Sequence, residues 1–341
     1  MRSFDWTLAL VLVLVLFLTL AVTLAIAGPG TAAVATGQQS PDRRIDGCTT
    51  ISNPGRYVLG ADVVNATVDT CIRVTASDVL IDGAGHRVDG VGAFGSAGVL
   101  VTGGSNVTVR NLTATDWDDG VRFVDVASLT VTGTQTTGNR VGLSLVSVRD
   151  GRFTDDVARS NAVAGVFLAG DSRNNTLRNT TATANALVGV QAVEARETTI
   201  AGATARDNQF GVALFGTRGT VLRDSVASSN AIAGVWLSAA RGSDVSGNSL
   251  SNRFYGVYLA DGAQNNTVAA NRAVGNPVGV RLRSSDGNAI LDNRVRNSSD
   301  TAILLIESDR NRVVGNRGTG NQRGVVAAGT ENVVSNNSVG G

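Results

Sequence analysis

A short motif recurs along most of this chain at almost constant spacing. It is a small residue followed by an apolar, an unrestricted and an apolar residue, as in Gly234-Val235-Trp236-Leu237. Successive copies lie 22 to 24 residues apart, and they begin at Gly98, Gly120, Gly142, Gly165, Gly189, Gly211, Gly234, Gly256, Gly279, Ala302 and Gly324. A fixed period of this size is typical of a solenoid, in which each repeat buries its apolar face by stacking on its neighbours.

The residue types favour a β-solenoid over a leucine-rich repeat. The stretches between motifs are dense in Gly, Asn, Thr, Ser and Val, which disfavour helices, whereas Val and Thr favour strands. Within a motif, Val235 and Leu237 are apolar while the position between them is unrestricted. This alternation predicts a strand with one face in the core and the other toward solvent.

A second strand and a corner complete the expected repeat unit. Further apolar positions follow the motifs about a dozen residues later, at Val107, Leu129, Leu177, Ile200, Val221, Val245, Val268, Ile290, Val313 and Val333. Asparagines precede the motifs at Asn139, Asn161, Asn185, Asn208, Asn230, Asn252, Asn276 and Asn321. Asn suits tight turns, and stacked Asn side chains can form hydrogen-bonded ladders. The sequence therefore predicts an all-β protein: a right-handed parallel β-helix of about 12 coils.

The N-terminal part has a different character. Residues 8–27 form an almost unbroken apolar run, and about 20 such residues can span a bilayer as a helix. We expect residues 1–35 to be a signal peptide or an N-terminal membrane anchor, 36–47 a linker and 48–341 the β-helix. Both alternatives predict an exported protein, secreted or held at the extracellular face of the cell membrane by residues 8–27 if these are not cleaved.

The net charge bears on the expected partners, and the cysteine spacing bears on covalent links between coils. A net charge of +1 with 4% aromatic residues does not indicate a nucleic-acid-binding surface. Cys48 and Cys71 lie 23 residues apart, which is one repeat unit, so they fall at the same corner of adjacent coils. We expect a disulfide between them, and a thiolate metal pair is the alternative.

The first coils resemble those of NosD-type right-handed β-helix proteins. The resemblance extends from about residue 48 to the end, and it is carried by Cys48-Thr-Thr-Ile51, Asn53-Pro-Gly-Arg-Tyr57, Cys71-Ile-Arg-Val74 and Val79-Leu-Ile-Asp-Gly-Ala-Gly-His86. It implies an exported accessory protein linked to copper delivery for nitrous oxide reductase. The later repeats are similar to those of carbohydrate-binding and sugar-hydrolase β-helices. Copper sites use His, Cys and Met, and with one His and one Met the chain has too few such ligands for a high-affinity site.

A cluster of acidic residues interrupts the repeat at Asp116-Trp117-Asp118-Asp119. Local breaks in a regular pattern are where functional residues are expected. Asp116, Asp118 and Asp119 could bind Ca²⁺, or two of them could act as acid and base on a glycosidic bond. The cluster is similar to the paired aspartates of pectin-degrading β-helix hydrolases, but the Gly-His-Gly and Arg-x-Lys elements of those enzymes are absent.

Two alternatives to catalysis follow from the residues around this cluster. Trp117 stands where other coils carry the corner Asn, and Arg122 lies close by, so both could contact a ligand. Arg140 lies one repeat after Asp118, and charge pairing across coils would make the cluster a purely structural corner.

A second candidate site is the outward position between the two core residues of each motif. In three successive motifs it holds Trp236, Tyr258 and Arg281. Neighbouring strands are about 4.8 Å apart, so these side chains should form a continuous aromatic and cationic strip. Such a strip could stack on sugar rings. A partner interface, or partial coverage by a loop, is the alternative.

These observations favour an exported, non-catalytic binding protein with a polysaccharide or surface glycan as its ligand. A polysaccharide lyase or hydrolase centred on Asp116, Asp118 and Asp119 is the first alternative. The second is a NosD-like accessory role in copper-enzyme maturation, with another protein as the partner. We expect no resident cofactor, and calcium is the ion that the acidic cluster could hold.

Overall fold

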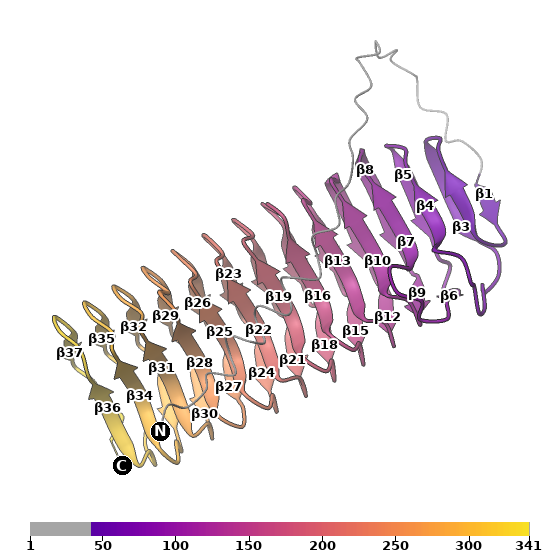
Figure 1. Ribbon diagram of the computed structural model, residues 1–341. Helices are drawn as coiled ribbons and strands as arrows, with labels where there is room; N and C mark the ends of the chain where they lie inside the picture. The colour runs from indigo at the N-terminus through magenta and orange to yellow at the C-terminus, as the bar shows by residue number, and fades with distance from the viewer. Residues whose placement is uncertain (1–41, 341) are drawn as a thin grey trace, which may run out of the picture. The chain divides into compact units, whose positions relative to one another are not determined.

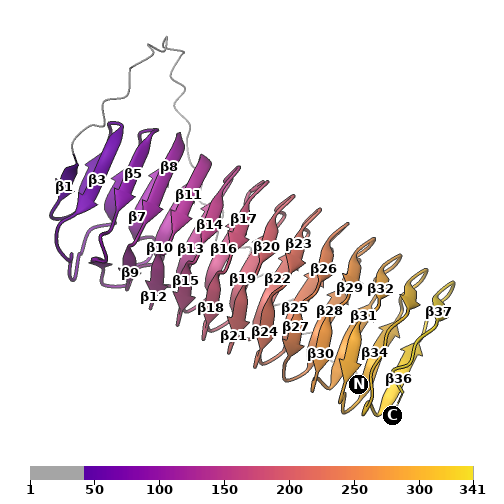
Figure 2. The same ribbon diagram turned by 180° about the vertical axis from the view of Figure 1, so that it is seen from behind.

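A computed structural model describes residues 42–340 as a right-handed parallel β-helix built from three parallel sheets. The Gly-Val-x-Leu motifs form the 13-stranded motif sheet. Its strands, in spatial order, are β2 (Thr49–Ile51), β4 (Thr70–Val74), β7 (Ala97–Thr102), β10 (Asp119–Val124), β13 (Val141–Val146), β16 (Ala164–Ala169), β19 (Val188–Val193), β22 (Phe210–Phe215), β25 (Ala233–Ser238), β28 (Tyr255–Ala260), β31 (Val278–Arg283), β34 (Thr301–Ile306) and β36 (Arg323–Ala327). Figures 1 and 2 show the succession of coils from opposite sides.

The second sheet has 14 strands and contains the second apolar position of each repeat. Its strands are β1 (Arg43–Ile45), β3 (Gly55–Leu59), β5 (Val79–Asp82), β8 (Ser105–Arg110), β11 (Ala127–Thr132), β14 (Arg152–Thr154), β17 (Thr176–Arg178), β20 (Thr199–Ala201), β23 (Val221–Arg223), β26 (Asp244–Ser246), β29 (Thr267–Ala269), β32 (Ala289–Leu291), β35 (Arg312–Val314) and β37 (Val333–Ser335).

A third sheet of ten short strands closes each coil, and the repeat pattern did not predict it. Its strands, from the N-terminal end, are β6 (Arg87–Asp89), β9 (Thr113–Thr115), β12 (Gln135–Thr137), β15 (Val157–Arg159), β18 (Thr181–Thr183), β21 (Thr204–Arg206), β24 (Val226–Ser228), β27 (Ser249–Ser251), β30 (Arg272–Val274) and β33 (Arg294–Arg296). The buried central residue of most of these strands is small, as at Ala158, Ala182 and Ala205, so it does not stand out in the sequence as the larger apolar residues of the other two sheets do.

The motif residues occupy the positions predicted for them. Val235 and Leu237 of β25 are fully buried, and Val235 stands in register with Val212 and Val257 of the adjacent coils. Stacking in register gives each buried side chain a similar neighbour above and below, which builds one continuous core along the solenoid. The motif glycine is needed for space, because a Cβ on Gly234 would lie 2.5 Å from Nδ2 of Asn252.

The corner asparagines form hydrogen-bonded ladders inside the solenoid. Asn208 shows the repeating geometry: its backbone N–H and its Nδ2 both donate to Oδ1 of Asn230, at 3.1 and 3.2 Å. The same Nδ2 also donates to the carbonyl of Ala182 at 3.1 Å. Each Asn therefore satisfies backbone groups that would otherwise be buried at the corner without partners, which is costly.

One ladder runs along each of the three corners. The corner between the third and motif sheets has Asn139, Asn161, Asn185, Asn208, Asn230, Asn252 and Asn276. The corner between the second and third sheets has Asn248, Asn271, Asn293, Asn316 and Asn337. The corner between the motif and second sheets has Asn266, Asn288, Asn311 and Asn332.

The N-terminal end of the solenoid begins earlier than expected. Strand β1 lies within residues 36–47, which the sequence suggested as a linker, and it pairs in parallel with β3 from Arg43 to Ile45. Ile45 is only 5% exposed, so this strand covers the end of the core. The predicted disulfide between Cys48 and Cys71 is confirmed and joins the first coils. The apolar run 8–27 lies outside the described residues, and residues 42–340 contain no helix long and apolar enough to cross a bilayer.

Substitution of Asn230 by Ala tests the ladder. The change removes the acceptor for the backbone and side chain of Asn208 and the donor to the carbonyl of Ala205. Each buried polar group left without a partner costs about 1–3 kcal/mol, so the midpoint of urea unfolding should fall clearly. Ser251→Ala, at an exposed position of β27, is the control and should leave the midpoint unchanged. Equal midpoints for the two variants would contradict a stabilising role for the ladder.

Candidate functional site

The acidic cluster lies where β10 begins, in the N-terminal purple part of the solenoid (Figure 1). Trp117 takes the first place in the corner ladder, because its backbone N–H donates to Oδ1 of Asn139 at 3.0 Å. Its indole Nε1 donates to the carbonyl of Val88 at 3.0 Å, and the side chain is 1% exposed. The residue predicted to contact a ligand is thus part of the core, where a large ring fills the end of the Asn ladder.

Two of the aspartates and two arginines form one compact charged group, which we call the β10 site: Asp118, Asp119, Arg122 and Arg140. Nε of Arg140 lies 2.5 Å from Oδ1 of Asp118, and its Nη2 lies 3.6 Å from Oδ1 of Asp119. Nη1 of Arg122 lies 3.6 Å from Oδ2 of Asp119. Arg140 therefore links both carboxylates from the next coil, as the charge-pairing alternative predicted.

Burial changes the acidity of Asp119. Its side chain is 5% exposed, and this desolvation raises the pKa to about 6, although Arg122 and Arg140 act in the opposite direction. Its Oδ1 accepts no hydrogen bond from the described residues. A carboxyl group with such a pKa can exchange a proton near neutral pH, which is the property that acid–base chemistry needs.

Asp116 does not join this group. It is exposed and has a left-handed backbone (φ 56°) at the corner. Residues 42–340 contain no group of three or more His, Cys, Asp or Glu side chains that could hold a metal ion. The three carboxylates considered as calcium ligands are thus not brought together.

A loop beside the β10 site carries an exposed aromatic ring that the repeat pattern did not single out. Residues 90–96 connect β6 to β7, whereas only residues 116–118 separate β9 from β10 in the next coil. Oγ of Ser96 accepts from the backbone N–H of Asp118 at 3.2 Å, so the loop is attached to the site. Phe94 in this loop is 82% exposed. The signal in the sequence was the Gly-rich insertion itself, Gly90-Val-Gly-Ala-Phe-Gly-Ser96.

The second candidate site differs from its expected form. Trp236 is 2% exposed and Tyr258 8% exposed, so these rings do not present the open stacking faces that the outward strip predicted. The Trp236 ring stacks on Phe210 at 4.6 Å between centroids and packs edge-on against Phe215 at 4.8 Å. These phenylalanines come from the preceding coil and were not part of the predicted strip.

Arg281 is likewise engaged within the protein. Its guanidinium lies over the rings of Tyr255 and Tyr258, at 5.2 and 5.1 Å from their centroids, and it donates a hydrogen bond to the Tyr255 hydroxyl. The structure therefore brings Trp236, Tyr258 and Arg281 together as predicted, but as a packed aromatic cluster with a cation on top.

Comparison with known proteins places the chain by family and by fold. The NosD family model, described as periplasmic copper-binding protein, matches residues 73–222 and 217–340. No curated protein matches the sequence.

Among solved structures, the Dettilon tailspike protein has a TM-score of 0.58 and 15% identity over 81% of this chain, which spans 62% of the tailspike chain. The A-module of mannuronan C-5 epimerase AlgE4 from Azotobacter vinelandii has a TM-score of 0.53 and 18% identity, with coverage of 84% of this chain and 91% of that one. The Agl-KA catalytic domain has a TM-score of 0.53 and 12% identity, with coverage of 85% and 62%. At sequence identities of 12–18%, these structural similarities show a shared fold.

The pKa of Asp119 predicts a pH dependence that Asp119→Asn should reduce. Because the pKa is raised on folding from 3.8 to about 6, the protonated form favours the folded state, and this contribution is lost as the pH rises through 6. From pH 4 to pH 7 the loss is on the order of 2 kcal/mol. The urea midpoint of the variant should fall less over this interval than that of the wild type. Asp116→Asn is the control, and a fall equal to the wild type in Asp119→Asn would contradict the burial argument.

Proposed function

This chain belongs to the NosD family of periplasmic copper-binding proteins, and from its surface we propose that it is an exported glycan-binding protein without catalytic activity. The observation that carries the proposal is the exposed Phe94 ring on a loop hydrogen-bonded to the β10 site. Carbohydrate sites combine an aromatic face, on which a sugar ring stacks, with charged groups that bind its hydroxyls. Arg122 and Arg140, about one third exposed, supply such groups.

The neighbours in fold are consistent with a glycan ligand. Mannuronan, the substrate named for the epimerase, is a polysaccharide, and it is processed on the same type of solenoid. The long parallel faces of a β-helix suit an extended polymer, because binding groups can recur once per coil.

The second candidate function is catalysis. It is favoured by the raised pKa of Asp119, which suits a general acid, and by a second carboxyl group, that of Asp118, beside it. Two observations oppose this role. A general acid must come within about 3 Å of the reacting atom, but the Asp119 side chain is 5% exposed. Asp118 is held by Arg140 at 2.5 Å, so both carboxylates are engaged within the protein.

The copper chemistry of the family name does not fit these residues. Copper binds through His, Cys and Met side chains. The chain has two cysteines, which are joined in the disulfide, and its only histidine, His86, contacts Oδ1 of Asp62 at 3.0 Å. An accessory role in metalloenzyme maturation would have to act through a protein partner.

Binding of the full chain to a panel of neutral and acidic polysaccharides tests the proposal, with released reducing ends measured in parallel. Phe94→Ala should weaken binding about tenfold, which corresponds to the loss of one stacking contact of about 1–2 kcal/mol. Val91→Ala, at an exposed position of the same loop, is the control and should bind like the wild type. No products should appear.

Two results would overturn the proposal. Binding that Phe94→Ala leaves unchanged would remove the loop from the site. Product release that stops in Asp119→Asn would show that the protein is an enzyme, in agreement with the second candidate function.

A further inference from the structure

Five arginines occupy one position in five successive coils, in the turn between the motif sheet and the second sheet. We call them the arginine row, and their backbones pair in parallel from each coil to the next: Arg149, Arg173, Arg196, Arg218 and Arg241. All five are exposed. Ala127 precedes the row and Gln264 follows it in the same register.

The turn holds the backbone of each arginine in the same conformation. Arg218 shows the pattern: Thr217 before it is fully buried, and Gly219 after it has a positive φ of 62°. Its backbone N–H donates to Ala195 at 3.1 Å, and its carbonyl accepts from Glu197 at 2.9 Å. Because the backbone is fixed on both sides, the Cα atoms of the arginines recur about every 4.8 Å along the solenoid. The row therefore offers one guanidinium group per coil.

The side chains of the row contribute little to the fold. Arg196 makes an ion pair of 3.4 Å with Asp171, and both partners are more than half exposed. The other four arginines make no ion pair with the residues that the structure describes. Like charges side by side on adjacent strands destabilise a sheet. The repulsion between the arginines therefore lowers the stability of the fold, and a structural role does not explain the row.

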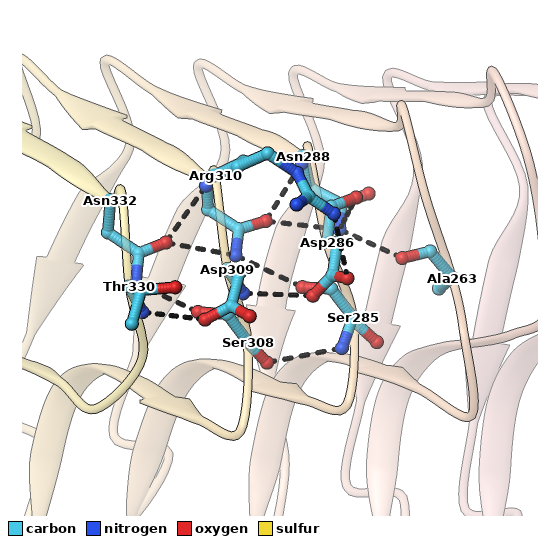
Figure 3. Close-up of polar contacts among 10 residues, drawn as sticks. Ala263, Ser285, Asp286, Asn288, Ser308, Asp309, Arg310, Thr330 and Asn332 are labelled. Carbon is cyan, nitrogen blue, oxygen red and sulfur yellow. Dashed lines mark hydrogen bonds and ion pairs between the residues drawn. The ribbon is translucent and has the colours of Figure 1, made fainter.

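The C-terminal coils show what this turn uses when its role is structural. There Asp286 and Asp309 occupy this position in two successive coils. Each follows a fully buried residue and precedes one with positive φ. Figure 3 shows that Oδ1 of Asp286 accepts from the backbone N–H of Asp309 at 2.8 Å, and that Oδ1 of Asp309 accepts from Thr330 at 2.6 Å. Asp286 also pairs with Arg310 at 3.4 Å. These acidic side chains cap the next turn, whereas the arginines leave their charge directed to solvent.

The acidic neighbours of the row differ along its length, and in space Glu194 and Glu197 of the preceding coil lie beside Gly216 and Gly219, on either side of Arg218. Acidic residues lie next to Arg149 and on both sides of Arg196 in the sequence. Arg218 and Arg241 instead have Gly, Ala or Thr at the two positions before them and Gly after them.

We propose that the arginine row binds a linear acidic polysaccharide, whose carboxylates or sulfates lie along the solenoid axis. Arginine binds carboxylate and sulfate groups through paired hydrogen bonds, and a row with one cation per coil matches a polymer with one anion per repeating unit. Bound anions also remove the repulsion between neighbouring guanidinium groups. This inference deepens the glycan-binding function and rests on it for the class of ligand, but it does not depend on the loop of residues 90–96.

Binding of the full chain to polygalacturonate, measured over a range of NaCl concentrations, tests the row. The double variant Arg218→Gln/Arg241→Gln should bind about tenfold more weakly and with a shallower salt dependence. Arg159→Gln/Arg206→Gln removes the same charge from exposed positions of the third sheet and should retain wild-type binding. Arg218→Lys/Arg241→Lys keeps the charge without the paired geometry and should lie between the two.

The outcomes separate the row from the loop. Equal loss in the two double Gln variants would overturn the inference, since net charge alone would then explain binding. If Phe94→Ala weakens binding and Arg218→Gln/Arg241→Gln does not, the inference about the arginine row is overturned and the proposed function remains intact. Absence of binding to polygalacturonate and to neutral glycans would overturn both the proposed glycan-binding function and the inference about the arginine row. Tighter binding of a single-stranded oligonucleotide, lost in the same variant, would replace the ligand class with nucleic acid.

Discussion

The fold depends on how the backbone turns three corners per coil without losing hydrogen bonds. The corners lie against an apolar core, so water cannot satisfy their amide groups. Along the ladders an asparagine solves this with one side chain, because its oxygen accepts from the coil before it while its nitrogen donates to that coil's strand carbonyl and to the next asparagine. Outside the ladders Ser and Asp side chains accept the corner N–H, as Ser225 does from Ala203. Since each Asn of a ladder pairs with the Asn in register with it, the arrangement repeats from coil to coil.

With the corners satisfied from inside, the outer positions of the turns are free to vary. The turn between the motif and second sheets shows this freedom most clearly, because the same backbone holds exposed arginines in its central coils and capping aspartates in its C-terminal coils. Position in the fold is therefore a poor guide to role, and the contacts of each side chain decide it. By that criterion Asp118, which Arg140 holds, is largely structural, whereas the Phe94 ring and the C-terminal arginines of the row have no structural partner of comparable strength.

Much of the fold could be predicted because its elements repeat. The motif strands, the second strands, the Asn corners and the disulfide all follow from regular spacing in the sequence. The third sheet was missed because the buried residue of its short strands is mostly Ala or Thr, which gives no clear apolar signal, and β1 was missed because it is one strand outside the periodic region. The site was harder to predict. Trp117 and Trp236 were assigned to ligand contact from residue type, yet hydrogen bonding and ring packing make both part of the protein interior, while Phe94 stands in an insertion that follows no period.

The ladders also restrict how this molecule can change in length. An insertion of a few residues in one corner would move an asparagine out of line and leave two amide groups unpaired, whereas duplication of a complete 22- to 24-residue unit restores every contact. The solenoid can therefore grow or shrink only in steps of one coil. Each step adds or removes one residue in every outer row, so the number of contacts offered to a polymer is set by the count of coils, and gene duplication can adjust avidity without any new side chain.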